Sequence, residues 1–151
     1  QIFNCKSILI IIFRLLRSVQ FSVFFFININ KIKDTFILEG YKINPYDYIK
    51  NADLLACSSD YEGFSSFVAE GLILGKAIVT TKCNGMEELL GSSQYGIITE
   101  CDANALAEGI KILLSDNSLK EEYERNALER GKGFSIEASV KETEKLFERV
   151  K

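Results

Sequence analysis

From residue 35 onward, short apolar runs alternate with longer segments in which apolar residues recur every three or four positions. The short runs end at glycine- or serine-containing turns, which is typical of buried strands. The longer segments begin at capping residues such as Asp102 and Ser135, which is typical of helices that pack by one face. Strands that alternate with helices form a parallel sheet covered on both faces. The sequence therefore predicts an α/β fold of this kind.

The expected elements follow from the same pattern. Glycine can adopt the left-handed conformation that ends a helix, and Gly75 stands where the second helix should stop. A serine at 65 or 66 is expected to cap that helix, and Ser118 is expected to begin the helix before the last. Strands are predicted at 35–38, 54–57, 77–80 and 96–99, and helices at 46–51, 66–74, 86–90, 103–114, 118–130 and 136–150.

The first thirty residues differ from this body and are treated as a separate apolar segment, with the domain itself at 31–151. Arg14 and Arg17 lie between two apolar runs, and an arginine at the centre of a membrane helix costs about 2.5–3.5 kcal/mol. A spanning helix is therefore disfavoured, and no small-residue cleavage site indicates a signal peptide. Three interpretations stay open: buried elements of the sheet, an interfacial membrane anchor, or sequence foreign to the domain.

Composition excludes several classes of function. The 151-residue chain has no histidine, so it contains neither a histidine general base nor a histidine metal ligand. Its net charge of −3 does not favour nucleic acid as a partner. The four cysteines, Cys5, Cys57, Cys83 and Cys101, form no C-x-x-C pair, and we expect them to be reduced and mostly buried. Reduced thiols suit a cytoplasmic protein.

Two loops are expected to face a ligand, because parallel sheets bind ligands beyond the carboxyl ends of their strands. The first spans residues 58–66 and leads into a serine-capped helix, whose first amides and dipole would suit a diphosphate. Gly63 would let the ligand approach the backbone closely, and Glu70 could accept hydrogen bonds from a ribose diol. The second loop spans residues 81–85. Many α/β proteins have such a loop without a ligand, so the residues alone leave both interpretations open.

A longer ordered set of motifs narrows this choice. Glu62-Gly63-Phe64 through Glu70-Gly71 resembles the E-x7-E signature of the family-4 retaining glycosyltransferases. The resemblance covers about residues 35–150 and is greatest to members that build bacterial capsular or surface polysaccharides. It implies the C-terminal half of a GT-B fold, a Rossmann-like domain that holds a nucleotide-sugar donor. Further matches lie at 36–41, 44–46, 75–81, 83–90, 95–98 and 130–136.

The resemblance also implies a role for each site residue. Glu62 would be the catalytic-site carboxylate that meets the hydroxyls of the transferring sugar, and Glu70 would bind the ribose. The donor would be a nucleotide sugar, expected to be a UDP-sugar, and neither a metal nor another cofactor would be needed. Backbone amides at Gly63, Phe64, Ser65 and Ser66 would bind the sugar and diphosphate, and the base would lie near Leu38, Gly40 and Tyr41.

The chain departs from the family pattern at its beginning. No residue before Lys33 matches the glycine-arginine loop and the lysine that offset the diphosphate charge in the family. The N-terminal GT-B domain, which would supply the site for a glycan or lipid-linked acceptor, is missing. We therefore expect a fragment without turnover of its own, cytoplasmic or peripherally associated with the inner face of the membrane.

Two alternatives stay open. One is a non-catalytic interaction module that docks through its apolar N-terminal segment or its last helix, where Val140, Leu146 and Phe147 are expected to be exposed. The other is a domain of a related GT-B sugar epimerase, which the lack of histidine disfavours.

Overall fold

The structure is a computed structural model that describes residue 39 and residues 42–149. The apolar segment at 1–30 and the strand expected at 35–38 lie outside the described residues, as do Leu38, Gly40 and Tyr41. Within the described part, no helix is long and apolar enough to cross a membrane.

Three parallel strands form the sheet, in the order β1-β2-β3. The strands are β1 (Leu55–Cys57), β2 (Ile78–Thr81) and β3 (Ile97–Thr99). Every residue of β1 and β2 is buried, as expected for strands covered on both faces. Leu55 pairs with Ile78, and Thr81 pairs with Thr99, so the carboxyl ends of all three strands meet at one edge.

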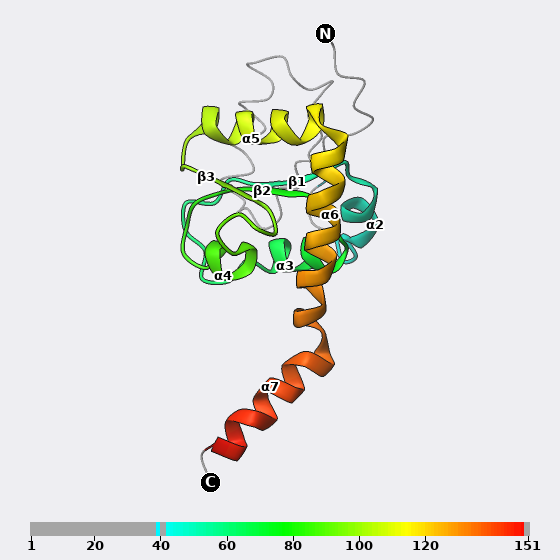
Figure 1. Ribbon diagram of the computed structural model, residues 1–151, viewed down its shortest axis with the longest axis vertical. Helices are drawn as coiled ribbons and strands as arrows, with labels where there is room; N and C mark the ends of the chain where they lie inside the picture. Colours follow the sequence, from blue (N-terminus) through cyan, green and yellow to red (C-terminus); the bar gives the residue numbers. More distant parts are fainter. Residues whose placement is uncertain (1–38, 40–41, 150–151) are drawn as a thin grey trace.

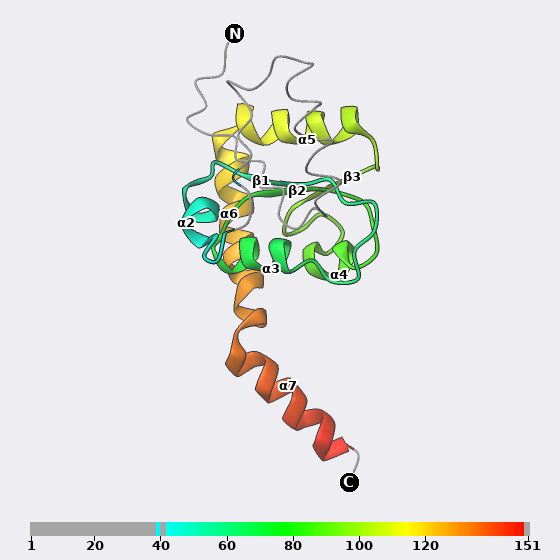
Figure 2. The same cartoon turned by 180° about the vertical axis from the view of Figure 1, so that it is seen from behind.

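Helices cover both faces of this sheet, as the sequence predicts (Figures 1 and 2). On one face lies α5 (Ala103–Ser115), which packs Leu113 against Val79 of the central strand. On the other face lie α3 (Ser66–Ile73) and α4 (Met86–Leu90), which bury Leu72 and Leu89 completely. Short helix α2 (Tyr46–Asn51) adds Ile49 to that second core.

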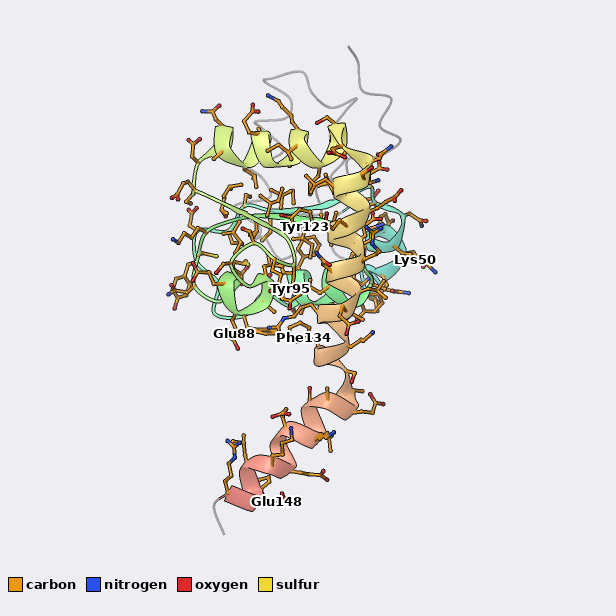
Figure 3. The ribbon with its side chains drawn as sticks, in the orientation of Figure 1. Lys50, Glu88, Tyr95, Tyr123, Phe134 and Glu148 are labelled. Carbon is orange, nitrogen blue, oxygen red and sulfur yellow. The ribbon has the colours of Figure 1, made fainter. Side chains whose placement is uncertain are left out.

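The chain packs closely against the domain up to Gly131 and is more exposed after it. Helix α6 (Asn117–Gly131) packs against α3 so closely that a Cβ atom at Gly131 would stand 2.5 Å from the carbonyl oxygen of Leu72. A short 3-10 turn, η1 (Lys132–Phe134), then leads to α7 (Ile136–Arg149), which has no buried residue. Figure 3 shows Glu148 of α7 far from the sheet, whereas Phe134 lies against the body of the domain.

Local signals place most helix ends correctly. Gly75 has the expected left-handed backbone, with φ of 63°, and Ser65 caps α3 by accepting a hydrogen bond from the amide of Val68. Asp102 caps α5 through two amides, Asn104 and Ala105. The predicted start of α6 at Ser118 is wrong by one residue, because the carboxylate of Asp116 accepts the amide of Leu119 and starts the helix at Asn117.

Candidate functional site

The loop between β1 and α3 leaves the carboxyl edge of the sheet and ends at the start of a helix. Ser65 is buried, and its Oγ accepts the Val68 amide at 3.4 Å, so this side chain serves the helix rather than the solvent. Gly63 and Ser66 are exposed. The ring of Phe64 lies edge-on to that of Phe134, with centroids 6.1 Å apart. Phe64 nevertheless stays 51% exposed, so both its backbone and part of its ring face the solvent here.

Glu62 is half-buried and held by the same loop. The hydroxyl of Ser59 donates to Glu62 Oε1 at 3.0 Å. The carbonyl of Ser59 in turn accepts from Thr81 Oγ1 at 2.7 Å, which links the loop to the end of β2. Two neighbouring strands thus set the position of this carboxylate.

The second predicted loop reaches the first. Gly85 has a left-handed backbone with φ of 84°, and a Cβ atom there would stand 2.3 Å from the carbonyl oxygen of Gly63. Only glycine fits such a backbone approach. Lys82 and Asn84 are exposed on this loop, and the Lys82 ammonium lies 3.9 Å from the Glu87 carboxylate. The structure therefore brings together the two loops that the sequence singled out separately.

Glu70 lies on α3, eight residues after Glu62, and is half-buried. Burial raises the pKa of its carboxyl group above the ordinary value, and no other cause contributes to that shift. Its neighbours on α3, Ala69 and Gly71, are buried in the core. A carboxylate that loses hydration without a compensating cation is typical of a ligand-binding position.

The cysteines are free, but the expectation that they are mostly buried is wrong for the described residues. Cys57 is buried, Cys83 is half-buried and Cys101 is exposed. Cys57 is the last residue of β1 and belongs to the buried core, whereas Cys83 and Cys101 follow the ends of β2 and β3. All three therefore lie near the ligand-facing edge of the sheet. The Cys101 thiol donates to Asp60 at 3.0 Å. Burial, followed by the neighbouring Cys57 and Glu62, raises the pKa of the Cys83 thiol.

The turn near residue 40 is described only at its two flanks. Glu39 and Lys42 form an ion pair at 2.9 Å, and the hydroxyl of Tyr48 donates to Glu39 at 3.1 Å. The Lys42 ammonium also lies 5.2 Å from the centre of the Tyr48 ring. Glu39 and Lys42 are thereby tied to Tyr48 of α2, while Leu38, Gly40 and Tyr41 lie outside the described residues.

The acidic residues of the loop do not form a metal site by their geometry. In the part of the chain that the structure describes, no group of three or more cysteine, aspartate or glutamate side chains could hold a metal ion. Asp60 and Glu62 each have a neighbouring hydrogen-bond donor, Cys101 and Ser59 respectively.

Comparison with known proteins identifies the family. The family described as glycosyl transferases group 1 matches residues 27–130, more than half of the chain. The chain belongs to this glycosyltransferase family. A relative from Campylobacter jejuni, N-acetylgalactosamine-N,N'-diacetylbacillosaminyl-diphospho-undecaprenol 4-alpha-N-acetylgalactosaminyltransferase, is 33% identical over 105 residues, which cover 68% of this chain and 29% of the relative. The chain thus spans about three tenths of that relative's length.

Solved glycosyltransferase structures share the fold. Anabaena Alr3699/HepE, solved in complex with UDP, has a TM-score of 0.77 at 21% identity over 88% of this chain and 38% of that protein. The C-terminal domain of a glycosyl transferase group 1 family protein from Francisella tularensis has a TM-score of 0.68 at 18% identity over 80% of this chain and 64% of that domain. These likenesses confirm the GT-B-type α/β fold that the sequence predicts.

Sequence reasoning missed the residues that hold the site together. Ser59 lies in the β1–α3 loop and bonds to Glu62. Thr81 and Cys101, at or just after the ends of β2 and β3, bond to Ser59 and Asp60 of that loop. None of the three has a distinctive motif of its own. Their positions at or after predicted strand ends were the available signal. Their pairing depends on the order of the strands, which the local pattern does not contain.

Proposed function

We propose that this glycosyltransferase chain binds the nucleotide-sugar donor at the loop between β1 and α3. The observation that carries the proposal is the position of Glu62 and Gly63 directly before the capped start of α3, at the carboxyl edge of the parallel sheet. The family membership of the chain supports the same site.

The start of α3 suits the diphosphate. The first amides of a helix have no partners within the helix, and the helix dipole adds partial positive charge there. The loop amides from Gly63 to Ser65 and the first helical amide, at Ser66, would be the donors. Gly63 has open space where a side chain would stand. Hydrogen bonds of this kind offset the diphosphate charge, so we propose that binding needs neither a metal nor another cofactor.

In this proposal Glu70 binds the ribose hydroxyls. A charged carboxylate accepts hydrogen bonds from two vicinal hydroxyls and repels a phosphate in the same place. Burial raises the pKa of the Glu70 carboxyl group and thus disfavours its charged form. Donors from a diol would compensate for that burial, so binding would favour the ionised form.

Glu62 faces the transferring sugar in this proposal. One carboxylate oxygen is held by Ser59, which leaves the other to accept hydrogen bonds from sugar hydroxyls. The base would lie at the turn of Leu38, Gly40 and Tyr41, outside the described residues. We propose a UDP-sugar as the donor, supported by the fold shared with a protein solved with UDP.

The whole protein would transfer this sugar, with retention, to a glycan or lipid-linked acceptor. The Campylobacter relative bears undecaprenol in its name, and that lipid points to an acceptor at the inner face of the cytoplasmic membrane. Since the chain spans about three tenths of that relative, the remaining GT-B domain would supply the acceptor site.

Calorimetry on the 151-residue chain tests the donor site. We expect UDP to bind, and Glu70→Ala to weaken UDP binding about tenfold through loss of charge-assisted hydrogen bonds to ribose. Glu108→Ala, at an exposed glutamate of α5, is the control and should bind as the wild type does. Absence of binding to both UDP and GDP would contradict the proposal.

One observation favours a second candidate, a non-catalytic interaction module. Helix α7 exposes Ile136 and Phe147 at 80% and 69% of their surfaces. Sedimentation that shows concentration-dependent association, together with absence of nucleotide binding, would favour this function.

A further inference from the structure

We propose that Ser59 is a positioning residue, which orients the Glu62 carboxylate toward the donor sugar. This inference rests on the proposed function and adds to it a residue outside the E-x7-E pattern. Ser59 Oγ lies 3.0 Å from Glu62 Oε1 and is half-buried, so the bond is partly shielded from water.

Counting protons gives the direction of the hydrogen bonds. Ser59 Oγ also lies 3.5 Å from the Sγ atom of Cys57, and either atom could donate there. A serine hydroxyl has one proton, and Ser59 donates it to Glu62 Oε1. With the Ser59 proton given to Glu62, the Cys57 thiol must donate to Ser59. The chain of donors therefore runs from Cys57 through Ser59 to Glu62.

The first two members of this chain, Cys57 and Ser59, are both anchored. Cys57 is the last residue of β1 and is only 9% exposed. The backbone of Ser59 is held separately, because its carbonyl accepts from Thr81 Oγ1 at 2.7 Å. Removing the Ser59 hydroxyl would therefore leave the loop backbone in place while freeing the Glu62 carboxylate to rotate. This separation lets a side-chain variant test orientation without removing the loop anchor.

The Ser59 hydroxyl should affect binding of the sugar but not binding of the nucleotide. In the proposed complex Glu62 contacts the sugar, whereas the nucleotide contacts α3 and Glu70. Loss of the Ser59 hydroxyl should then weaken the part of the affinity that the sugar adds, and leave the affinity for UDP unchanged. A general loss of structure would weaken both.

Calorimetry with UDP, UDP-N-acetylgalactosamine and UDP-glucose on the 151-residue chain provides the test. We expect Ser59→Ala to weaken binding of the preferred UDP-sugar about threefold to tenfold, with UDP binding unchanged. Ser59→Thr, which keeps the hydroxyl, should restore the sugar affinity. Ser92→Ala, at an exposed serine outside both ligand-facing loops, is the control and should resemble the wild type.

A double variant separates orientation from other effects. In a chain with Glu62→Ala, the further change Ser59→Ala should have no effect on sugar binding, because no carboxylate is left to orient. The inference would be overturned if Ser59→Ala reduced the sugar affinity equally in the presence and absence of the Glu62 carboxylate. It would also be overturned by unchanged sugar affinity in Ser59→Ala, or by a wild type that binds both UDP-sugars no more tightly than UDP. Failure of the wild type to bind UDP would instead overturn the proposed function.

If Ser59→Ala does not fold, Cys57→Ala tests the same chain of donors from its other end. This variant removes the donor to Ser59 but keeps the Ser59 hydroxyl, so we expect a loss of sugar affinity smaller than threefold, again with UDP unchanged. A loss confined to UDP would overturn the inference.

Discussion

Helices α3 and α7 have the same kind of N-terminal cap but lie in different surroundings. Ser65 and Ser135 each cap their helix by accepting the amide three residues later, at 3.4 and 3.1 Å. In α3, Val68 and Leu72 are then completely buried beneath the sheet, whereas α7 has no buried residue (Figure 1). The same local start thus yields a core element in one case and an exposed arm in the other. The difference lies in the neighbours, because α3 meets both the sheet and α6.

The comparison is sharpest for one leucine in each helix. Leu72 is 0% exposed and Leu146 is 60% exposed. Leu72→Ala should lower the free energy of unfolding by about 2–5 kcal/mol, since it removes buried methyl groups and leaves a cavity. Leu146→Ala should change it by less than about 0.5 kcal/mol. Urea unfolding followed by circular dichroism measures both, and equal losses would show that α7 is part of the cooperative core.

A second pair of variants examines where the buried region ends. A Cβ atom at Gly131 would press on the backbone of Leu72 and Ile73, at 2.5 and 2.7 Å, while one at Gly133 would meet nothing within 4 Å. Gly131→Ala should therefore destabilise the chain by about 1–3 kcal/mol. Gly133→Ala, the control two residues on, should change stability by less than about 0.5 kcal/mol. Thermal unfolding compares the two, and an unaffected Gly131→Ala would mean that α3 and α6 are not in such close contact.

The smallest expected effect is on how the stability of the fold depends on pH. Burial raises the pKa of Glu70 on α3, whereas the hydrogen bond from Lys145 lowers the pKa of Glu142 on α7. Glu70 therefore stabilises the fold below its ordinary pKa, and that contribution is lost as pH rises through the folded-state value. The pH dependence for Glu142 is reversed. Its contribution to the stability of the fold is present above its ordinary pKa and is lost as pH falls.

Glutamine variants measure this difference in sign. Relative to the wild type, Glu70→Gln should become more stable as pH rises above the ordinary glutamate pKa and through the raised folded-state pKa of Glu70. Glu142→Gln should be slightly less stable than the wild type above the ordinary glutamate pKa, and this difference should disappear as pH falls below it. The change should be small because 69% of the Glu142 side chain is exposed to solvent. Urea unfolding at several pH values gives both trends. A Glu70→Gln curve parallel to that of the wild type would show that burial imposes no cost on this carboxylate.

Much of the candidate site could be predicted from the sequence, because it depends on short-range signals. Gly63 and Ser65 mark a loop that leads into a capped helix, and the alternation of elements places that loop at the carboxyl edge of a parallel sheet. The long-range hydrogen bonds that anchor the loop around Glu62 were not predictable in this way. They join Ser59 to Thr81, and Asp60 to Cys101, across 22 and 41 residues of sequence.

What the amino-acid sequence determined alone is where helices begin and end and which family the chain resembles. Asp102 starts α5 and Gly75 ends α3 through backbone groups only a few residues away, so the information is local. Only the tertiary structure decided that the cysteines lie at the ligand-facing edge, that Gly85 touches the Gly63 loop, and that α7 stays exposed. These features depend on which distant segments meet, and burial is a property of the neighbours rather than of the residue.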